Sequence, residues 1–391
     1  MKLPWNKGRK ASQEEIVIPE GRILLRVILL IVCVAITVLS LAYGLRTWLT
    51  AEGGVQKIIP VNDRQLSSCE DFTFVYDLGA GEASATVEKK ALRALYTQAG
   101  REAYEIFSAE CESDACKGLW YLNGHINEPV TVEKALYQAL ELVQQSGSRY
   151  AYLAPIQEGY DALFAWGDAR EAAEMDPGEN EALRAFYAAA AAFARDPGKI
   201  DLVLLGKDTV CLSVSEDYMA FARENDIHRW IDFGWMKNAF TADYLAESLA
   251  AAGYTRGTLI SSDGFIRHLD EREGKEFTFL LPFSRGGVEE LRFDRPVSLV
   301  YLHEYPVEPD GGRYWTAGNG RVITGYLDVA DGLCRSAVPE MLAGSASRDC
   351  AQIALQVAPL FIADSLDASA AALLTSREDI QIWYEEAANG E

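Results

Sequence analysis

The amino-acid sequence predicts an α+β fold behind a single N-terminal transmembrane helix. Three observations support this prediction. Residues 27–45 form an apolar run without a charged side chain, residues 84–195 are dominated by helical patterns, and short apolar runs typical of strands dominate from residue 201 onward. The elements are considered below in the order of the chain.

The apolar run at residues 27–45 has the length of one membrane-spanning helix. Its 19 residues would reach about 28 Å as a helix, close to the thickness of a bilayer's hydrocarbon core. Basic residues are more frequent before the run than directly after it, which predicts a cytoplasmic N-terminus and an exterior C-terminal bulk. These are Lys2, Lys7, Arg9, Lys10, Arg22 and Arg26 before the run, against Arg46, Lys57 and Arg64 after it. The protein is thus expected in the cell membrane as a single-pass protein.

A cleaved signal peptide is the alternative for this segment, because Ala42, Tyr43 and Gly44 are tolerable at a cleavage site. The long basic region and the long apolar run favour an uncleaved anchor. The predicted division is a basic cytoplasmic segment at 1–22, the anchor at 23–45, a linker rich in Gly, Pro and polar residues at 46–68, a main domain at 69–375 and an acidic tail at 376–391.

In the main domain, an apolar run at 72–76 predicts a strand, and three helices follow at 84–110, 131–145 and 179–195. The first has Leu92, Tyr96 and Ala99 on one face. The third has an alanine-rich middle and ends at a Pro-Gly pair.

Strands are then predicted at 201–205, 209–214, 277–283, 297–302 and 321–327, interrupted by helices at 239–252 and 348–361. In the helix at 239–252, Leu245 and Leu249 lie four residues apart, so both are expected in the core. The segment Gly206, Lys207, Asp208 and Thr209 is expected to be a hairpin turn, since it lacks the upstream glycine of a phosphate-binding loop.

The net charge of −22 argues against nucleic acid as a partner, because phosphate binding needs a basic surface. Cys111 and Cys116 have a spacing that allows a small disulfide loop outside the cell, and a pair of reduced thiols is equally compatible with the sequence. The four histidines are scattered without the spacing of a metal site, and common hydrolase and kinase signatures are absent. Composition alone therefore identifies no reaction.

One ordered series of residues carries more information. Asp232, Gly234, Phe240 and Asp243 are followed by a predicted helix and then by Gly264 after an apolar run; Tyr305, residues 325–332 and residues 349–353 continue the series. The series resembles the ApbE family of FAD:protein FMN transferases, which reads D-x-G-x-x-x-K-G-Y-x-x-D, then N-x-G-G-D, S-G-x-Y, H-I-I-D-P-x-T-G and D-A-L-A-T. The resemblance covers most of the exterior domain and implies the ApbE-like flavin transferase fold.

The resemblance implies FAD and Mg²⁺ as cofactors. It implies nucleotide-binding positions at Asp232, Asn238, Gly264 and Tyr326, and metal ligands at Asp349 and at the main-chain carbonyl of Trp235. Each residue also has a structural interpretation. Asp232 could cap the next helix, Asp349 suits the start of a helix, Asn238 could begin one, and Trp235 could serve packing alone.

The sequence departs from the family at five positions. These are Asn238 for the lysine, Ala239 for the following glycine, Asp263 for the first glycine of the pair, Gly325 for the histidine and Ile353 for the threonine that binds the metal. Loss of an oxygen ligand and of a cation weakens neutralisation of the FAD diphosphate. Restoring Ile353→Thr with Asn238→Lys is therefore expected to recover transfer.

Three hypotheses follow. We favour a degenerate ApbE-like domain, tethered outside the membrane, which binds a flavin nucleotide with weak or absent FMN transfer. The second hypothesis is an active Mg²⁺-dependent FAD:protein FMN transferase that modifies a Thr or Ser of an extracytoplasmic flavoprotein acceptor or of a membrane redox complex. The third is a membrane scaffold component without enzymatic activity.

Overall fold

The computed structural model describes residues 28, 32–34, 36–40, 52–62, 65–113, 115–165, 174–282, 287–305 and 313–384. The chain divides into two compact units, Met1–Glu52 and Gly53–Glu391. In the first unit, the predicted basic segment 1–22 and most of the predicted anchor 23–45 lie outside the described residues. Within the described part of the chain, no helix has both the length and the apolar character that a membrane crossing requires.

The second unit is built on a seven-stranded sheet in which every neighbouring pair is antiparallel. The strand order is β1-β2-β6-β7-β10-β13-β14. The strands are β1 (Gly54–Ile58), β2 (Phe72–Leu78), β6 (Gly257–Ser261), β7 (Phe265–His268), β10 (Val297–His303), β13 (Glu340–Ser345) and β14 (Gln381–Tyr384).

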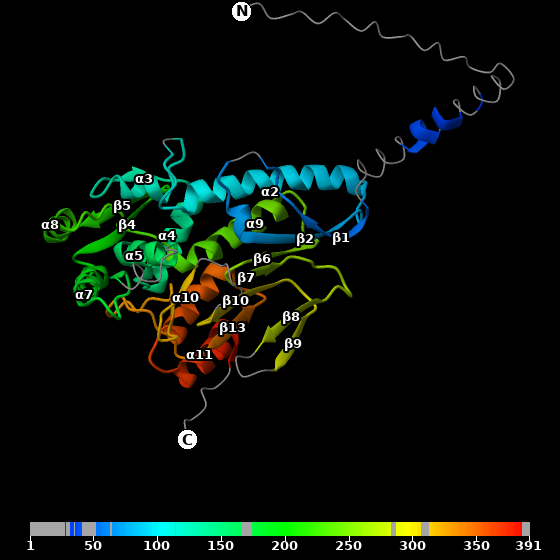
Figure 1. Cartoon of the computed structure of the whole chain (residues 1–391). Coiled ribbons are helices and arrows are strands. Elements are labelled where there is room, and N and C mark those ends of the chain that lie inside the picture. Colours follow the sequence, from blue (N-terminus) through cyan, green and yellow to red (C-terminus); the bar gives the residue numbers. More distant parts are fainter. Residues whose placement is uncertain are drawn as a thin grey trace, which may run out of the picture. The chain divides into compact units, whose positions relative to one another are not determined.

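Three helices cover one face of this sheet: α2 (Ala85–Phe107), α9 (Lys237–Ala251) and α10 (Cys350–Phe361). Figure 1 shows α2 and α9 side by side along the sheet. In β2, Phe74 and Tyr76 are buried while the intervening residues are partly exposed, which is the alternation of a strand with one covered face. Leu245 and Leu249 are fully buried in the same core, as predicted.

The other face of the sheet is covered in its central part by a hairpin of β8 (Phe277–Pro282) and β9 (Val288–Phe293). A second, smaller core forms there from Ile266, Leu281, Leu299, Tyr301 and Leu342. All residues of β10 from Val297 to Leu302 are therefore buried, because both faces of this central strand are covered.

A second group of elements adjoins the sheet at the end of α2 (Figure 1). It contains a three-stranded sheet of order β3-β5-β4 and, among the described residues, five helices. The elements are β3 (Val130–Thr131), β4 (Ile200–Gly206), β5 (Thr209–Val214), α3 (Leu119–Asn123), α4 (Lys134–Ser146), α5 (Ala154–Ala165), α7 (Glu181–Arg195) and α8 (Glu216–Glu224). Short 3-10 helices lie at Ser68–Asp71 beside α2 and β2, at Tyr150–Leu153, and at Gly234–Met236 directly before α9. The hairpin of β11 (Tyr314–Thr316) and β12 (Val322–Thr324) contacts α5.

The α+β class and most long elements are confirmed. The predicted helices at 84–110, 131–145, 179–195, 239–252 and 348–361 correspond to α2, α4, α7, α9 and α10 with ends that differ by a few residues. The predicted turn at 206–209 joins β4 to β5, with left-handed backbone at Gly206, Lys207 and Asp208. The run at 321–327 forms only the three-residue strand β12.

Both predicted ends of the main domain need correction. Residues 46–68 were expected to be a linker, but they contain β1, which pairs with β2 along its whole length. Residues 376–391 were expected to be an acidic tail, but α11 (Ala368–Glu378) ends inside this range and β14 pairs with β13. Short strands at the edge of a sheet need only modest hydrophobicity, so composition does not separate them from a linker.

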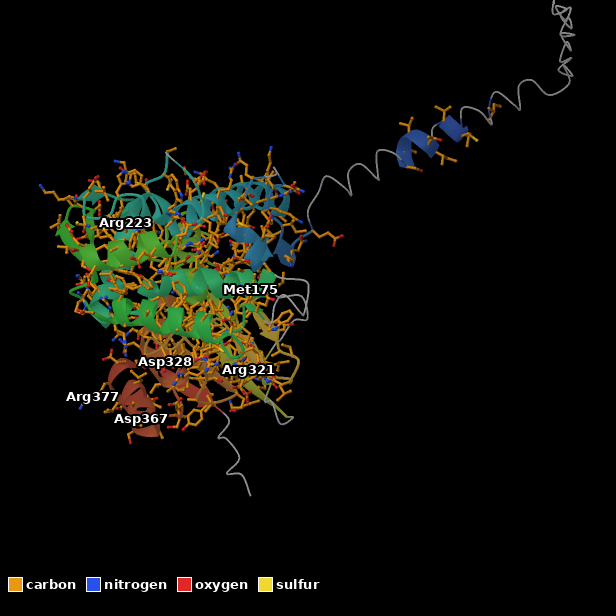
Figure 2. The ribbon with its side chains drawn as sticks, turned by 60° about the vertical axis from the view of Figure 1, so that its left-hand side comes forward. Met175, Arg223, Arg321, Asp328, Asp367 and Arg377 are labelled. Atoms are coloured by element: carbon orange, nitrogen blue, oxygen red, sulfur yellow. The ribbon has the colours of Figure 1, made fainter. Side chains whose placement is uncertain are left out.

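Helix α11 has charges that complement its dipole. Asp367 caps the N-terminus, where it accepts hydrogen bonds from the N–H groups of Ser369 and Ala370, and Arg377 lies in the last turn. Figure 2 shows Asp367 and Arg377 on this C-terminal helix. The helix packs against α10 and is followed by β14.

Candidate functional site

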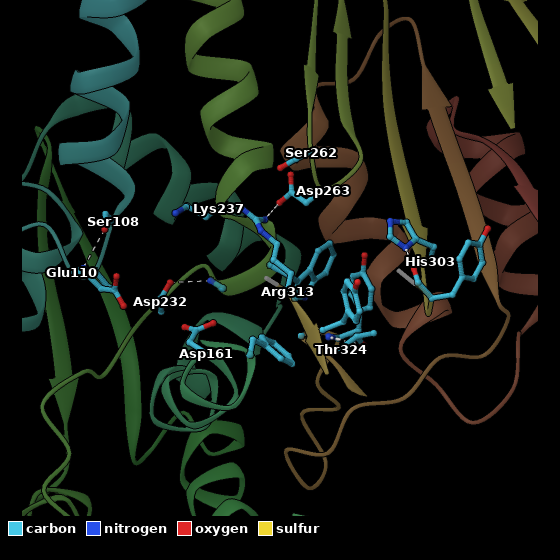
Figure 3. A pocket seen from close by; sticks show the side chains of 18 residues that line it. Ser108, Glu110, Asp161, Asp232, Lys237, Ser262, Asp263, His303, Arg313 and Thr324 are labelled. Carbon is cyan, nitrogen blue, oxygen red and sulfur yellow. Dashed lines mark hydrogen bonds and ion pairs between the residues drawn. The ribbon is translucent and has the colours of Figure 1, made fainter. Parts of the chain in front are cut away.

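A cavity of about 370 Å³ opens between the end of α2, the start of α9 and the turn that joins β6 to β7. The ends of β10 and the hairpin β11–β12 complete its wall. Figure 3 shows side chains from these separate segments turned toward the same space. The lining includes the charged residues Glu110, Asp161, Asp232, Lys237, Asp263 and Arg313, and the aromatic residues Phe164, Trp235, Tyr305, Tyr314 and Tyr326.

The loop before α9 forms the floor of the site, and Asn123 fixes its conformation. The Asn123 Oδ1 atom accepts hydrogen bonds from the N–H groups of Trp230 at 2.8 Å and Ile231 at 3.0 Å. Its Nδ2 atom donates to the Ile231 carbonyl at 2.9 Å. Since this amide is buried, the three bonds hold the loop in one conformation. Residues 227–233 form no strand, and the Asn123 side chain binds the backbone of Trp230 and Ile231 instead.

Asp232 lies in this loop and accepts a hydrogen bond from the Gly234 N–H at 2.9 Å. Arg229 contacts Asp232 at 3.2 Å and Glu110 at 2.9 Å. Asp161 faces the same guanidinium at 4.0 Å. Three carboxylates therefore share one arginine at this end of the cavity.

The environment raises the pKa of two of these carboxylates, Asp232 and Asp161. Burial raises the pKa of Asp232 above its ordinary value. Desolvation in the cavity wall, together with the negative charge of Asp232, raises the pKa of Asp161 to about 6. The Asp161 side chain remains 62% exposed, so it can exchange protons with the solvent.

A second polar cluster lies at the opposite side, around Asn238. This side chain is fully buried, and its Nδ2 atom donates to both carboxylate oxygens of Asp263 at 3.1 Å and to Asp71 at 3.3 Å. Arg313 forms ion pairs with the same two carboxylates, and its contact with Asp71 is 3.3 Å. Asn238 therefore lies behind the cavity wall, and Asp263 and Arg313 form the surface in front of it (Figure 3).

Gly264 has a structural role next to this cluster. Its φ of +95° is in the left-handed region, and a Cβ atom there would lie 2.1 Å from the Tyr301 carbonyl oxygen. Its own carbonyl accepts a hydrogen bond from the Tyr301 N–H at 2.8 Å. Only glycine allows the turn after β6 to approach β10 so closely.

Aromatic rings form the middle of the cavity. Trp235 packs edge-on against Tyr326, with ring centroids 5.3 Å apart, and lies nearly parallel to Phe265 at 6.3 Å. Tyr326 in turn contacts Phe361, the last residue of α10, at 5.0 Å. These contacts fix two of the predicted site residues, Trp235 and Tyr326, at the same wall.

The carboxylate predicted to bind Mg²⁺ is engaged in other contacts. Asp349 is the N-cap of α10 and forms an ion pair with Arg267, which also contacts Asp243 at 2.9 Å. Ile353 is fully buried and offers no oxygen. Among the described residues, no group of three His, Cys, Asp or Glu side chains is arranged to hold a metal ion.

Asp349 is also separated from Trp235. It caps the first residue of α10, whereas the Tyr326 ring that lines the cavity meets the last residue of this 12-residue helix. A helix of that length extends about 18 Å. Trp235 thus reaches the C-terminal end of α10 through Tyr326, and Asp349 lies at its N-terminal end.

Asp232, Trp235 and Tyr326 thus line one cavity, and Asn238 and Gly264 directly support its wall. Sequence reasoning did not identify Glu110, Asp161 and Arg313 as site residues. These three come from segments whose sequence has no distinctive spacing, so only the fold reveals them. All seven cysteines, including Cys111 and Cys116, are free thiols.

The site is thus a cavity of about 370 Å³ inside the α+β unit Gly53–Glu391. No protein-family model matches the sequence, and no curated protein matches it. Solved ApbE proteins have the same fold. The chain is similar to the flavinyl transferase ApbE of Pseudomonas stutzeri in its apo form, with a TM-score of 0.55 and 14% identity over 86% of this chain and 92% of that one.

Two further structures show the same likeness. The apbe protein of Thermotoga maritima has a TM-score of 0.54 and 13% identity, covering 86% of this chain and 97% of that one. The flavin transferase ApbE of Vibrio cholerae has a TM-score of 0.52 and 13% identity, covering 80% and 88%. The predicted resemblance is therefore confirmed at the level of the fold: the chain has the fold of these solved ApbE proteins.

Proposed function

We propose that this chain is a membrane-anchored, extracytoplasmic ApbE-like domain that binds a flavin nucleotide and transfers FMN weakly or not at all. One observation carries the proposal. Asp232 and Trp235 from one motif and Tyr326 from a later one line a single cavity, whereas Asp349, the carboxylate expected to bind Mg²⁺, pairs with Arg267 and does not line it.

The cavity suits a planar aromatic ligand. Its volume is within the range of about 300 to 1,000 Å³ that is typical of small-molecule sites. Trp235, Tyr326 and Phe164 provide flat apolar surfaces for ring contacts, and the surrounding carboxylates and hydroxyl groups can accept or donate hydrogen bonds. An isoalloxazine ring with polar edges fits this combination, which supports FAD as the nucleotide.

The charges in the cavity argue against efficient phosphoryl transfer. Four carboxylates, Glu110, Asp161, Asp232 and Asp263, line it against two cations, Lys237 and Arg313. A third cation, Arg229, is already shared by the first three carboxylates. Arg313 is already paired with Asp263, and Asn238 carries no charge. Because a diphosphate must be neutralised as charge shifts to the leaving phosphate, this lining favours binding without turnover.

The proposed location rests on the sequence. The apolar run at 27–45 with basic residues before it supports an exterior domain. Of two reporter enzymes fused after Glu391, the one that functions only outside the cytoplasm should be active, and the one that functions only inside it should be inactive. Activity of a cytoplasmic reporter at the same position would contradict this topology.

Flavin binding can be measured on the purified full-length chain in detergent by titrating FAD and following quenching of flavin fluorescence. Trp235→Leu should weaken binding at least tenfold, because it removes a cavity wall. Trp383→Leu is the matched control, since Trp383 lies on β14 away from the cavity, and it should leave affinity within twofold.

Transfer is tested by incubating the same protein with FAD, Mg²⁺ and a Thr-bearing acceptor peptide, then measuring flavin that stays attached after denaturation. Binding without covalent transfer supports the proposal. Strong transfer that EDTA abolishes would establish an active FAD:protein FMN transferase instead. Absence of flavin binding in the folded chain would leave the scaffold hypothesis.

A further inference from the structure

Two charged side chains that line the cavity, those of Asp161 and Lys237, have no hydrogen-bond partner among the described residues. The Asp161 carboxylate lies 4.0 Å from the Arg229 guanidinium, which is beyond the length of a hydrogen bond. The Lys237 ammonium forms no ion pair with any described carboxylate, although its charge acts on Asp161 and Asp232. A hydrogen-bond acceptor and a donor therefore face the same space without contacting each other.

Each of these two side chains has an aromatic residue beside it on its own wall of the cavity. Asp161 and Phe164 are three residues apart on α5, so they lie on the same face of that helix. Trp235 lies two residues before Lys237, the first residue of α9. Figure 3 shows Asp161 and Lys237 reaching the cavity from these two helices. A flat ring held by the aromatic side chains would therefore have the acceptor and the donor at its edge.

The charge at this end of the cavity favours a neutral group over a phosphate. Three carboxylates meet two cations here, so the group is negative when all its members are ionised; they are Glu110, Asp161, Asp232, Arg229 and Lys237. This balance repels a phosphate. A neutral ring edge that carries both an N–H and a C=O can instead use the acceptor and the donor together without adding charge.

We propose that Asp161 and Lys237 bind the pyrimidine edge of the isoalloxazine ring and thereby determine which ring the cavity accepts. The inference rests on the proposed flavin binding. This edge of an oxidised flavin has one N–H, at ring position N3, between two carbonyl groups. Asp161 accepts the hydrogen bond from this N–H, and Lys237 donates to one of the neighbouring carbonyl oxygens. A ring without the N–H leaves the carboxylate without its hydrogen bond and binds more weakly.

The test compares riboflavin with 3-methylriboflavin, in which a methyl group replaces the hydrogen at N3. Neither compound carries a phosphate. Each is titrated into the purified full-length chain in detergent, and binding is measured by the change in flavin fluorescence. The wild type should bind riboflavin at least tenfold more tightly than 3-methylriboflavin, because only riboflavin can donate to Asp161.

Substitutions show whether the two named side chains cause this preference. Asp161→Leu should weaken riboflavin binding at least tenfold and leave 3-methylriboflavin binding within twofold, whereas Asp161→Asn, whose amide oxygen can still accept, should keep a preference of more than threefold. Lys237→Met should weaken the binding of riboflavin and of FAD by the same factor, about fivefold, because the lost contact is to the ring. Lys90→Met is the matched control at an exposed lysine of α2, and it should leave both affinities within twofold.

Equal affinities of the wild type for riboflavin and 3-methylriboflavin would overturn the inference and leave the proposed flavin binding intact. A Lys237→Met variant that binds FAD more weakly but riboflavin as before would also overturn it, because the lysine would then bind the diphosphate. If the folded chain binds no flavin at all, the proposed function fails and this inference fails with it. The comparison of the two ligands needs no variant, so a substitution that prevents folding does not remove the test.

Discussion

Replacing Arg267 by methionine should destabilise the folded unit by about 3 kcal/mol. Arg267 is 16% exposed and joins α9, β7 and α10 through its ion pairs with Asp243 and Asp349. Methionine keeps part of the apolar stem but removes the charge. The Asp243 carboxylate, 13% exposed, is then left with hydrogen bonds from only the N–H groups of Cys350 and Ala351.

The size of the effect follows from the burial of Asp243. Removing one partner of a buried ion pair costs about 3 to 5 kcal/mol, and the two remaining N–H donors place this site at the lower end. Asp349 provides the matched control. It is 45% exposed, and asparagine caps a helix as well as aspartate does, so Asp349→Asn should cost less than about 1 kcal/mol although it removes an ion pair with the same arginine.

Acidity should change the cost of the Arg267 substitution. Burial raises the pKa of Asp243 to about 7, so the folded chain binds a proton more tightly than the unfolded chain and this residue's contribution to stability falls as pH rises from about 4 to 7. Without the guanidinium the pKa rises further. The destabilisation by Arg267→Met should therefore be larger at pH 8 than at pH 5.

The assay is urea unfolding monitored by tryptophan fluorescence. The free energies of unfolding of the wild type and the variants are compared where their m-values are equal. A loss below about 1 kcal/mol for Arg267→Met would refute the claim that Asp243 is a buried charge that depends on this arginine. An equally large loss for Asp349→Asn would assign the effect to the helix cap instead.

Three further predictions concern single sites. Gly264→Ala should cost more than about 3 kcal/mol in the same unfolding assay because of the clash with Tyr301, whereas Gly274→Ala, with positive φ but open space around it, should cost about 1 kcal/mol. Asp161→Asn removes a carboxylate whose pKa is raised to about 6. The difference in melting temperature, wild type minus variant, should therefore fall as pH rises from 4 to 7, and a constant difference would contradict the raised pKa. Ile353→Thr buries a hydroxyl in the core and should destabilise by about 1 to 3 kcal/mol without any Mg²⁺-dependent rise in melting temperature, and such a rise would show that a metal site exists.

The last of these predictions replaces an expectation from the sequence. Motif spacing placed Ile353 and Asn238 near the nucleotide, and the pair Ile353→Thr with Asn238→Lys was expected to recover transfer. In the structure Ile353 is in the core of α10, and a lysine at position 238 would compete with Arg313 for Asp71 and Asp263. We now expect this double variant to lose stability rather than gain activity.

The sequence predicted the elements whose hydrophobic pattern is long. α2 and α9 have a continuous buried face, and the hairpin of β4 and β5 has a turn that only a few residue types form. The floor of the cavity could be predicted from Asp232 and Trp235, because the motif is contiguous. Arg313 and Asp161 could not, since each reaches the cavity through tertiary packing that leaves no local pattern.

The positions of β1 and β14 determine where the protein can safely be shortened. These strands are the two borders of the main sheet, and each pairs with only one neighbour, β2 or β13. A protein cut to residues 69–375, the boundaries that composition suggests, would lose both and leave the backbone N–H and C=O groups of β2 and β13 open along their outer sides. Such open strands pair readily with those of other molecules, so the shortened protein should aggregate, whereas a cut before Gly53 should keep β2 and β13 covered by β1 and β14.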